Sequence, residues 1–164
     1  MAEKPTSFLD RGGAWVVIQF LLMALVVALG VAVHGDWTRL PMIVSGAMLF
    51  AAGGYAGVAG VIALGRNRTP YPRPLEGSEL AQCGIYARIR HPLYTSVMLA
   101  SFGWALIWQS LPSLITALVL VPFFFAKALR EERWLRERYP GYADYARRVP
   151  RFIPRLGSGS RTHL

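Results

Sequence analysis

The sequence has little cysteine, few acidic residues and few charged residues of any kind. Cys83 is the single cysteine in 164 residues, which excludes an intrachain disulfide and leaves no thiol-based metal signature. Only 9 residues are acidic against 18 basic ones, and charged residues make up 16% of the chain. With 54% hydrophobic residues, this composition is not that of an ordinary soluble domain and indicates a membrane protein.

Three long segments, residues 12–33, 40–65 and 93–126, contain no charged side chain. A spanning helix needs about 20 apolar residues, so the first two segments each suit one span. The third suits two shorter spans if the chain turns at Ser110–Ser113, where a proline removes a helix donor. We therefore predict an all-α integral membrane protein of one domain, residues 1–164, whose last two spans form a helical hairpin ahead of a cytosolic helical tail. The predicted transmembrane helices are about 15–33, 40–64, 94–108 and 112–128.

The distribution of basic residues predicts the orientation of these spans. Seventeen Lys and Arg residues lie before the first span, between the second and third, or after the fourth, against one, Arg39, in the first loop. The positive-inside rule places both termini and the central segment in the cytoplasm, as expected of a bacterial inner-membrane protein. The first span is expected to be a retained helix, because it is longer than a signal-peptide core needs. Basic residues near the C-terminus, Arg151 among them, are expected to contact anionic lipid headgroups rather than nucleic acid.

Proline and glycine mark three special segments. Gly53 and Gly57 allow close helix packing in the second span, and they leave a dimer through this face open. Pro122 is expected to interrupt the fourth span. The proline-rich segment 66–74 cannot form a regular helix, and we interpret it as an extended segment that is either a linker or a cover over a site.

Two polar clusters border the membrane on the same predicted side. The first precedes the third span and the second follows the fourth, so the hairpin between them can bring both together in space. Lys127 and Glu131 are four residues apart and share one helix face, whereas Glu132 points about 100° away. The clusters are Tyr86, Arg90, His91 and Tyr94, and Lys127, Arg130, Glu131 and Glu132. This set suits a zwitterionic, nucleoside-bearing ligand.

These motifs resemble the isoprenylcysteine carboxyl methyltransferase family, to which phospholipid methyltransferases are related. The matching elements are a Gly-x-Tyr before Arg-His-Pro-Leu-Tyr, a later Arg-Glu-Glu, and an ending with Val-Pro-x-x-Ile-Pro, within about residues 66–156. The resemblance implies an integral membrane enzyme that uses S-adenosylmethionine, with the cofactor held by segments 66–92 and 127–156. Cofactor-binding positions implied by it are Tyr71, Ser78, Glu79, Leu80, Ala81, Tyr86, Arg90, His91, Pro92, Leu93, Tyr94 and Glu131.

The resemblance further implies methyl transfer to a lipophilic acceptor, with the carboxylate of an isoprenylcysteine-like substrate as the first choice. Lys127 stands where the family usually has a substrate-facing Arg, and it cannot provide the bidentate contact of a guanidinium. Lys127 and Arg130 are predicted to orient an anionic substrate group. A carboxylate acceptor needs no base, whereas an amine or thiol would call on His91 or Glu132.

Other functions stay open at this point. The alternative acceptor, ranked second, is a phospholipid or another isoprenoid lipid. Membrane sterol reductases resemble this family in their C-terminal half and use NADPH. A non-enzymatic membrane scaffold with a lipid-binding basic tail is the third alternative.

Overall fold

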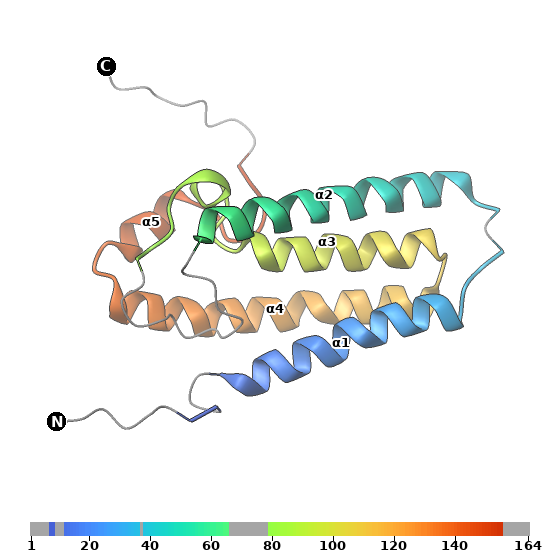
Figure 1. Cartoon of the computed structure of the whole chain (residues 1–164), viewed down its shortest axis with the longest axis horizontal. Helices are drawn as coiled ribbons and strands as arrows, with labels where there is room; N and C mark the ends of the chain where they lie inside the picture. Colours follow the sequence, from blue (N-terminus) through green and yellow to red (C-terminus); the bar gives the residue numbers. More distant parts are fainter. Residues whose placement is uncertain (1–6, 9–11, 37, 66–78, 156–164) are drawn as a thin grey trace, which may run out of the picture.

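The described part of the chain is all helical. A computed structural model describes residues 7–8, 12–36, 38–65 and 79–155, in which no strand occurs. Figure 1 shows four long helices lying side by side, with a short helix and a 3-10 turn at one end. The elements are α1 (Gly13–Ala32), α2 (Leu40–Leu64), η2 (Gly84–Ala87), α3 (Pro92–Ile107), α4 (Leu111–Arg138) and α5 (Tyr142–Arg148). The all-α prediction is confirmed, and the 3-10 turn was not foreseen.

Three of the described helices, α1, α2 and α4, are long and apolar enough to cross a membrane. Helix α3 is also apolar but has only 16 residues. Most side chains of α1 and α2 are not buried within the protein, and exposed Leu, Val, Ile and Phe residues cover their surfaces. Such surfaces match the apolar interior of a bilayer. The chain is therefore an integral membrane protein, while the count of four spans stays a prediction.

Prolines at the first turns define where three helices begin. Pro41, Pro92 and Pro112 all stand in the first helical turn, where the missing N–H donor would have no intrahelical partner. Pro112 is part of α4, in agreement with a span predicted from residue 112, and the turn lies slightly earlier than predicted, at Trp108 and Gln109. The prediction that Pro122 interrupts the fourth span was wrong, because α4 continues through it to Arg138.

Small residues allow α2 and α3 to pack closely. A Cβ at Gly53 would lie 2.8 Å from the backbone nitrogen of Ala100 and 2.8 Å from the carbonyl oxygen of Ser96. One at Gly57 would lie 2.6 Å from Oγ of Ser96. The small-residue face of α2 therefore packs against α3 of the same chain, which confirms the predicted close helix packing. Because α3 covers this face, it is not open to a second copy of the protein.

We expect Gly53→Ala to destabilise the protein by about 1–3 kcal/mol, because the new methyl group meets backbone atoms that cannot move aside. Gly54→Ala is a matched control one residue along the same helix, since a Cβ there has no neighbour within 4 Å. Thermal unfolding of both variants in detergent checks this. Equal melting temperatures for the two variants would contradict the close α2–α3 contact.

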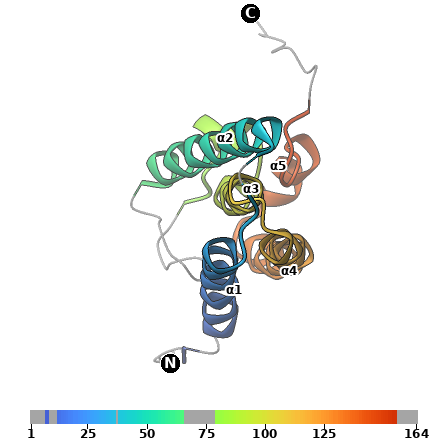
Figure 2. The ribbon, with the colours of Figure 1, turned by 90° about the vertical axis from the view of Figure 1, so that its right-hand side faces the viewer.

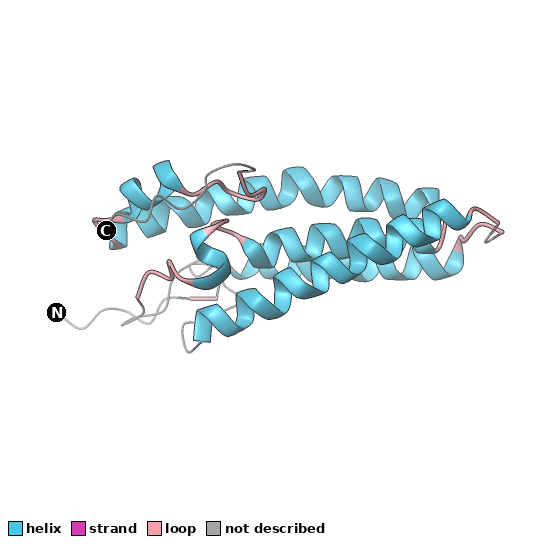
Figure 3. Ribbon diagram, turned by 90° about the horizontal axis from the view of Figure 1, so that it is seen from above, coloured by secondary structure: helices cyan, strands magenta, loops and turns pink. Residues whose placement is uncertain are grey.

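Helix α1 packs against α4 and α3 across the bundle. Figure 2 views α3 and α4 nearly end-on, with α1 and α2 inclined to them, and Figure 3 shows the bundle from above. Oγ of Ser113 donates a hydrogen bond of 2.8 Å to the carbonyl oxygen of Val26, and Oγ of Ser110 donates one of 3.0 Å to that of Leu29. Polar contacts of this kind hold helices together where apolar side chains face lipid. They attach α1 to the start of α4.

Candidate functional site at one end of the bundle

The two polar clusters predicted from the sequence meet in space. The N-terminal end of α3 and the charged C-terminal part of α4 both lie at the end of the bundle where α5 packs, which we call the α5 end (Figure 1). His91 caps α3, and its Nε2 lies 3.1 Å from Oε1 of Glu132 on α4. The hydroxyl of Tyr94 donates a hydrogen bond of 2.6 Å to Oε2 of Glu131. The hairpin therefore brings its two ends together, as predicted.

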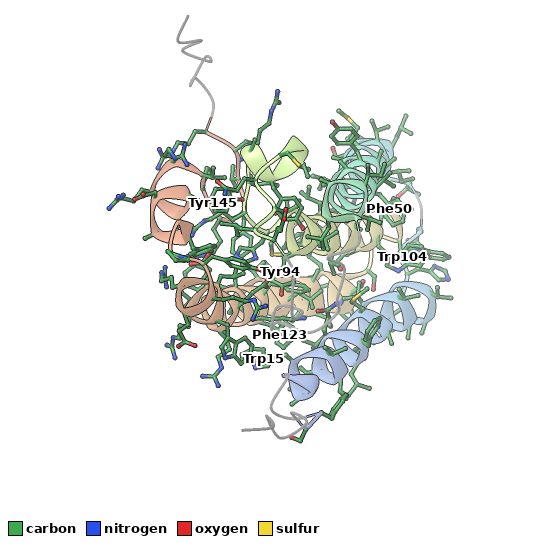
Figure 4. All side chains as sticks on the ribbon, turned by 60° about the vertical axis from the view of Figure 1, so that its left-hand side comes forward. Trp15, Phe50, Tyr94, Trp104, Phe123 and Tyr145 are labelled. Atoms are coloured by element: carbon green, nitrogen blue, oxygen red, sulfur yellow. The ribbon has the colours of Figure 1, made fainter. Side chains whose placement is uncertain are left out.

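Tyr94 is held between two rings. The imidazole of His91 stacks on it with a centroid distance of 5.2 Å and an interplanar angle of 2°, and Phe124 stacks at 4.9 Å. Figure 4 shows Tyr94 between the ribbons of α3 and α4. These contacts leave the Tyr94 ring little freedom, so its hydroxyl is held against Glu131. Glu131 itself keeps a quarter of its side chain exposed.

Glu132 lies beside Glu131 in sequence but has a different environment. Its side chain is fully buried, and Arg151 contacts both carboxylate oxygens, with Nε at 2.8 Å and Nη2 at 2.9 Å. Nη1 of Arg90 lies 3.3 Å from Oε1, and Nη2 of Arg136 lies 3.4 Å from Oε2. Several cationic donors around one buried carboxylate offset its loss of hydration. Glu132 therefore organises its neighbours and has little surface to offer to a substrate.

The segment after α5 returns to the start of α3. The backbone N–H groups of Arg90 and His91 donate to the carbonyl oxygens of Pro150 and Arg151, at 2.9 and 3.1 Å. Oγ1 of Thr95 donates to the carbonyl oxygen of Phe152 at 3.0 Å. The hydrogen bond that Arg151 donates to Glu132 raises the pKa of this guanidinium. Sequence reasoning placed Arg151 on lipid headgroups; in the structure it instead locks the C-terminal segment onto the site.

Tyr86 lies in η2 under the cover of α5. It is buried, and the hydroxyl of Tyr145 donates a hydrogen bond of 2.7 Å to its carbonyl oxygen. Burial, with a contribution from the nearby Glu131, raises the pKa of the Tyr86 phenol well above its ordinary value. Burial also raises the pKa of Tyr145 to about 12. Both phenols are therefore neutral, with the O–H proton retained, at any physiological pH.

Lys127 is buried in α4, one turn before Glu131. Its side chain is almost wholly enclosed, and Nζ donates a hydrogen bond of 2.5 Å to Oε1 of Gln19 on α1. Nζ also lies 5.1 Å from the centre of the Tyr94 ring. Sequence reasoning missed Gln19, although it is the one amide in an otherwise apolar segment. A single amide within an apolar helix is the sequence feature that could have identified Gln19.

Arg130 is the predicted residue that the structure does not bring into the cluster. It is exposed on α4, and its guanidinium lies 4.9 Å from the ring of Trp134, a cation–π contact. Its predicted role in orienting the substrate therefore gains no support from its position.

The remaining predicted cofactor positions are spread around the α5 end. Pro92 is buried at the start of α3, and Leu93 is half-buried and directed toward Gly60 of α2. Leu80 packs against the buried cluster of Tyr142, Tyr145 and Val149, while Ala81 is half-buried and Glu79 is exposed. Tyr71, Ser78 and the proline-rich segment 66–74 lie outside the described residues. Arg90 has a buried Nε with no hydrogen-bond partner in the described part of the chain.

The donor set fits S-adenosylmethionine in kind. Its ammonium group requires a carboxylate, and Glu131 is partly exposed with Oε1 unbonded by any described residue. Its carboxylate requires a cationic donor, and the buried Nε of Arg90 has no partner among the described residues. Within the described ranges, no group of three His, Cys, Asp or Glu side chains is placed to hold a metal ion.

Comparisons with known proteins match most of the chain. A family model described as phospholipid methyltransferase matches residues 41–141, which include α2 through to Gly141. The cobalt-zinc-cadmium resistance protein CzcN of Cupriavidus metallidurans is 35% identical over 82 residues, covering 49% of this chain and 38% of that protein. The nickel-cobalt-cadmium resistance protein NccN of Alcaligenes xylosoxydans xylosoxydans is 32% identical over 155 residues, covering 92% of this chain and 68% of that protein.

Proposed function

The chain belongs to the phospholipid methyltransferase family, and on this premise we propose that it transfers a methyl group from S-adenosylmethionine to a lipophilic acceptor at the α5 end of the bundle. The family match confirms the resemblance inferred from the His-Pro-x-Tyr and Glu-Glu motifs. It also extends into α2, which sequence reasoning had found similar only in being apolar. In this proposal the α5 end faces the cytoplasm of a bacterial inner membrane, as the distribution of basic residues favours.

The observation that carries the proposal is the arrangement of Glu131. Its carboxylate is attached on one side to Tyr94 and remains partly exposed at the edge of the apolar helices. When bound, the cofactor supplies an electrophilic methyl group on a sulfonium. Glu131 would hold the ammonium group of the cofactor, and Arg90 its carboxylate. Tyr94 orients Glu131, and Tyr86 and α5 enclose the site from the other side.

The contacts of His91 favour an acceptor that needs no base. Nε2 lies 3.1 Å from Glu132 and Nδ1 lies 3.6 Å from Oε2 of Glu131, so both nitrogens face carboxylates. Glu132 is fully occupied by arginine and histidine. Neither group is turned toward an acceptor proton, so the residues of this chain act by alignment and exclusion of water. A carboxylate acceptor of the isoprenylcysteine type fits this chemistry best.

A phospholipid amine is the second candidate, because the matching family model is described as phospholipid methyltransferase. The two acceptors give products with different chemistry. A methyl ester releases its methyl group as methanol under mild alkali, whereas a methylated amine is stable there.

The expected result is transfer of labelled methyl from S-adenosylmethionine, by the purified full-length protein, into an isoprenylcysteine analogue more than into phosphatidylethanolamine. The measurement is the volatile radioactivity, labelled methanol, that mild alkali releases from the lipid fraction, with boiled protein as the control. If all of the label stays non-volatile after this treatment, an amine would replace the carboxylate as the acceptor. Absence of transfer together with binding of NADPH would overturn the methyltransferase proposal in favour of a reductase.

A further inference from the structure

Lys127 is a charged residue enclosed near the end of an apolar helix, and it does not reach outward. Lysines at such positions usually extend to the membrane surface. Here the side chain is 1% exposed and contacts α1. Side chains on a helix lean toward its N-terminus, which for α4 means into the apolar part of the bundle. The ammonium group is therefore held inside the protein rather than at its surface.

No carboxylate of the described residues forms an ion pair with this ammonium group, although the charge of Glu131 acts on it from one turn further along α4. Its polar contact is the neutral amide oxygen of Gln19, and the ring face of Tyr94 lies on another side. Oε2 of Glu131 instead accepts a hydrogen bond from the hydroxyl of that same tyrosine. A buried cation with one neutral acceptor is costly unless an anion joins it. Two of its three N–H donors have no acceptor within the described part of the chain.

Gln19 is unusual in its own helix. It is the one amide between residues 12 and 33, a segment that is otherwise apolar, and its Nε2 lies 3.9 Å from Sδ of Met23. That contact leaves Oε1 for the lysine. Four residues earlier, on the same face of α1, Trp15 packs against Phe123 of α4, with ring centroids 5.5 Å apart. Both side chains are labelled in Figure 4. Helix α1 lies outside the segment that the family model matches, residues 41–141.

We propose that Gln19 and Lys127 form an anion-binding site between α1 and α4 that recognises the negatively charged group of the acceptor, with Gln19 as a specificity-determining residue. Gln19 holds Nζ in place, and the remaining N–H donors bind a carboxylate or a phosphate oxygen. This inference rests on the proposed function and narrows it to acceptors that carry an anionic group. Helix α1 thus contributes to substrate choice as well as to the scaffold.

The test compares Gln19→Met, which keeps size and loses the acceptor oxygen, with Gln19→Glu, which places a carboxylate beside the lysine. Leu21→Ala is the control, because Leu21 lies on the exposed side of the same helix. For Gln19→Met we expect the KM of the carboxylate acceptor to rise about ten-fold, with the dissociation constant of S-adenosylmethionine unchanged. Gln19→Glu is expected to raise KM further, because its carboxylate neutralises the ammonium and repels the acceptor.

Several outcomes overturn the proposal. One is an unchanged KM for the carboxylate acceptor in Gln19→Glu. This variant keeps a polar partner for the lysine, so we expect it to fold even if Gln19→Met does not. Another is an equal loss of cofactor affinity, which would indicate a structural role. The same comparison of KM values with phosphatidylethanolamine as the acceptor shows whether the anion that this site binds is a phosphate. If the wild-type protein transfers no methyl group, the proposed function fails. The anion site is then tested by itself, by measuring direct binding of the radiolabelled carboxylate lipid to the wild type and to Gln19→Glu.

Discussion

Glu131→Ala is expected to weaken S-adenosylmethionine binding by about 2–4 kcal/mol, or roughly 30- to 700-fold in the dissociation constant. The carboxylate is a partly exposed anion beside the start of α3, and Tyr94 holds it in one orientation. Its loss would leave the ammonium group of the cofactor without a counter-charge in an enclosed site. Isothermal titration or equilibrium dialysis with the purified protein measures the effect.

Glu137→Ala is the matched control for this experiment, because Glu137 is an exposed carboxylate on the same helix. We expect cofactor affinity to remain at the wild-type value in that variant. The melting temperature of Glu131→Ala should fall only slightly, since the residue is partly exposed. Wild-type affinity in Glu131→Ala would remove Glu131 from the cofactor site.

The second large effect is expected for Glu132→Ala, which should lower the free energy of unfolding by about 3–5 kcal/mol. Removing this buried carboxylate leaves Arg151, Arg90 and His91 without their shared partner. The C-terminal segment would then lose its side-chain attachment to the start of α3, although its backbone hydrogen bonds remain. Thermal or denaturant unfolding in detergent measures the change.

Arg136→Ala provides the comparison, because Arg136 contacts the same carboxylate at 3.4 Å from a half-exposed position. Such exposed pairs contribute about 0–1 kcal/mol, so this variant should unfold almost like the wild type. If Glu132→Ala and Arg136→Ala had the same free energy of unfolding, the buried cluster would not be what attaches the C-terminal segment. The difference between the two variants therefore measures the contribution of burial.

Several site contacts followed from local patterns in the sequence. His91 and Tyr94 stand at the entry of an apolar helix and Glu131 at the exit of the next, and a hairpin brings such ends together. Chain connectivity and helix periodicity sufficed for that prediction. They gave the two neighbouring glutamates different directions but did not determine which of them would be buried. Glu131 is partly exposed and Glu132 fully buried because of a 100° difference in direction and the presence of Arg151, 19 residues further along the chain.

The sequence by itself determined the all-α class, the apolar helices and the position of the hairpin, because hydrophobic runs, prolines and charge boundaries act over short distances along the chain. Only the tertiary structure decided which distant groups meet. Gln19 reaches Lys127 across 108 residues, and Arg151 reaches Glu132 because the segment after α5 turns back toward α3. Such pairs depend on how helices pack, and packing is a property of shape and volume in three dimensions that no local pattern encodes.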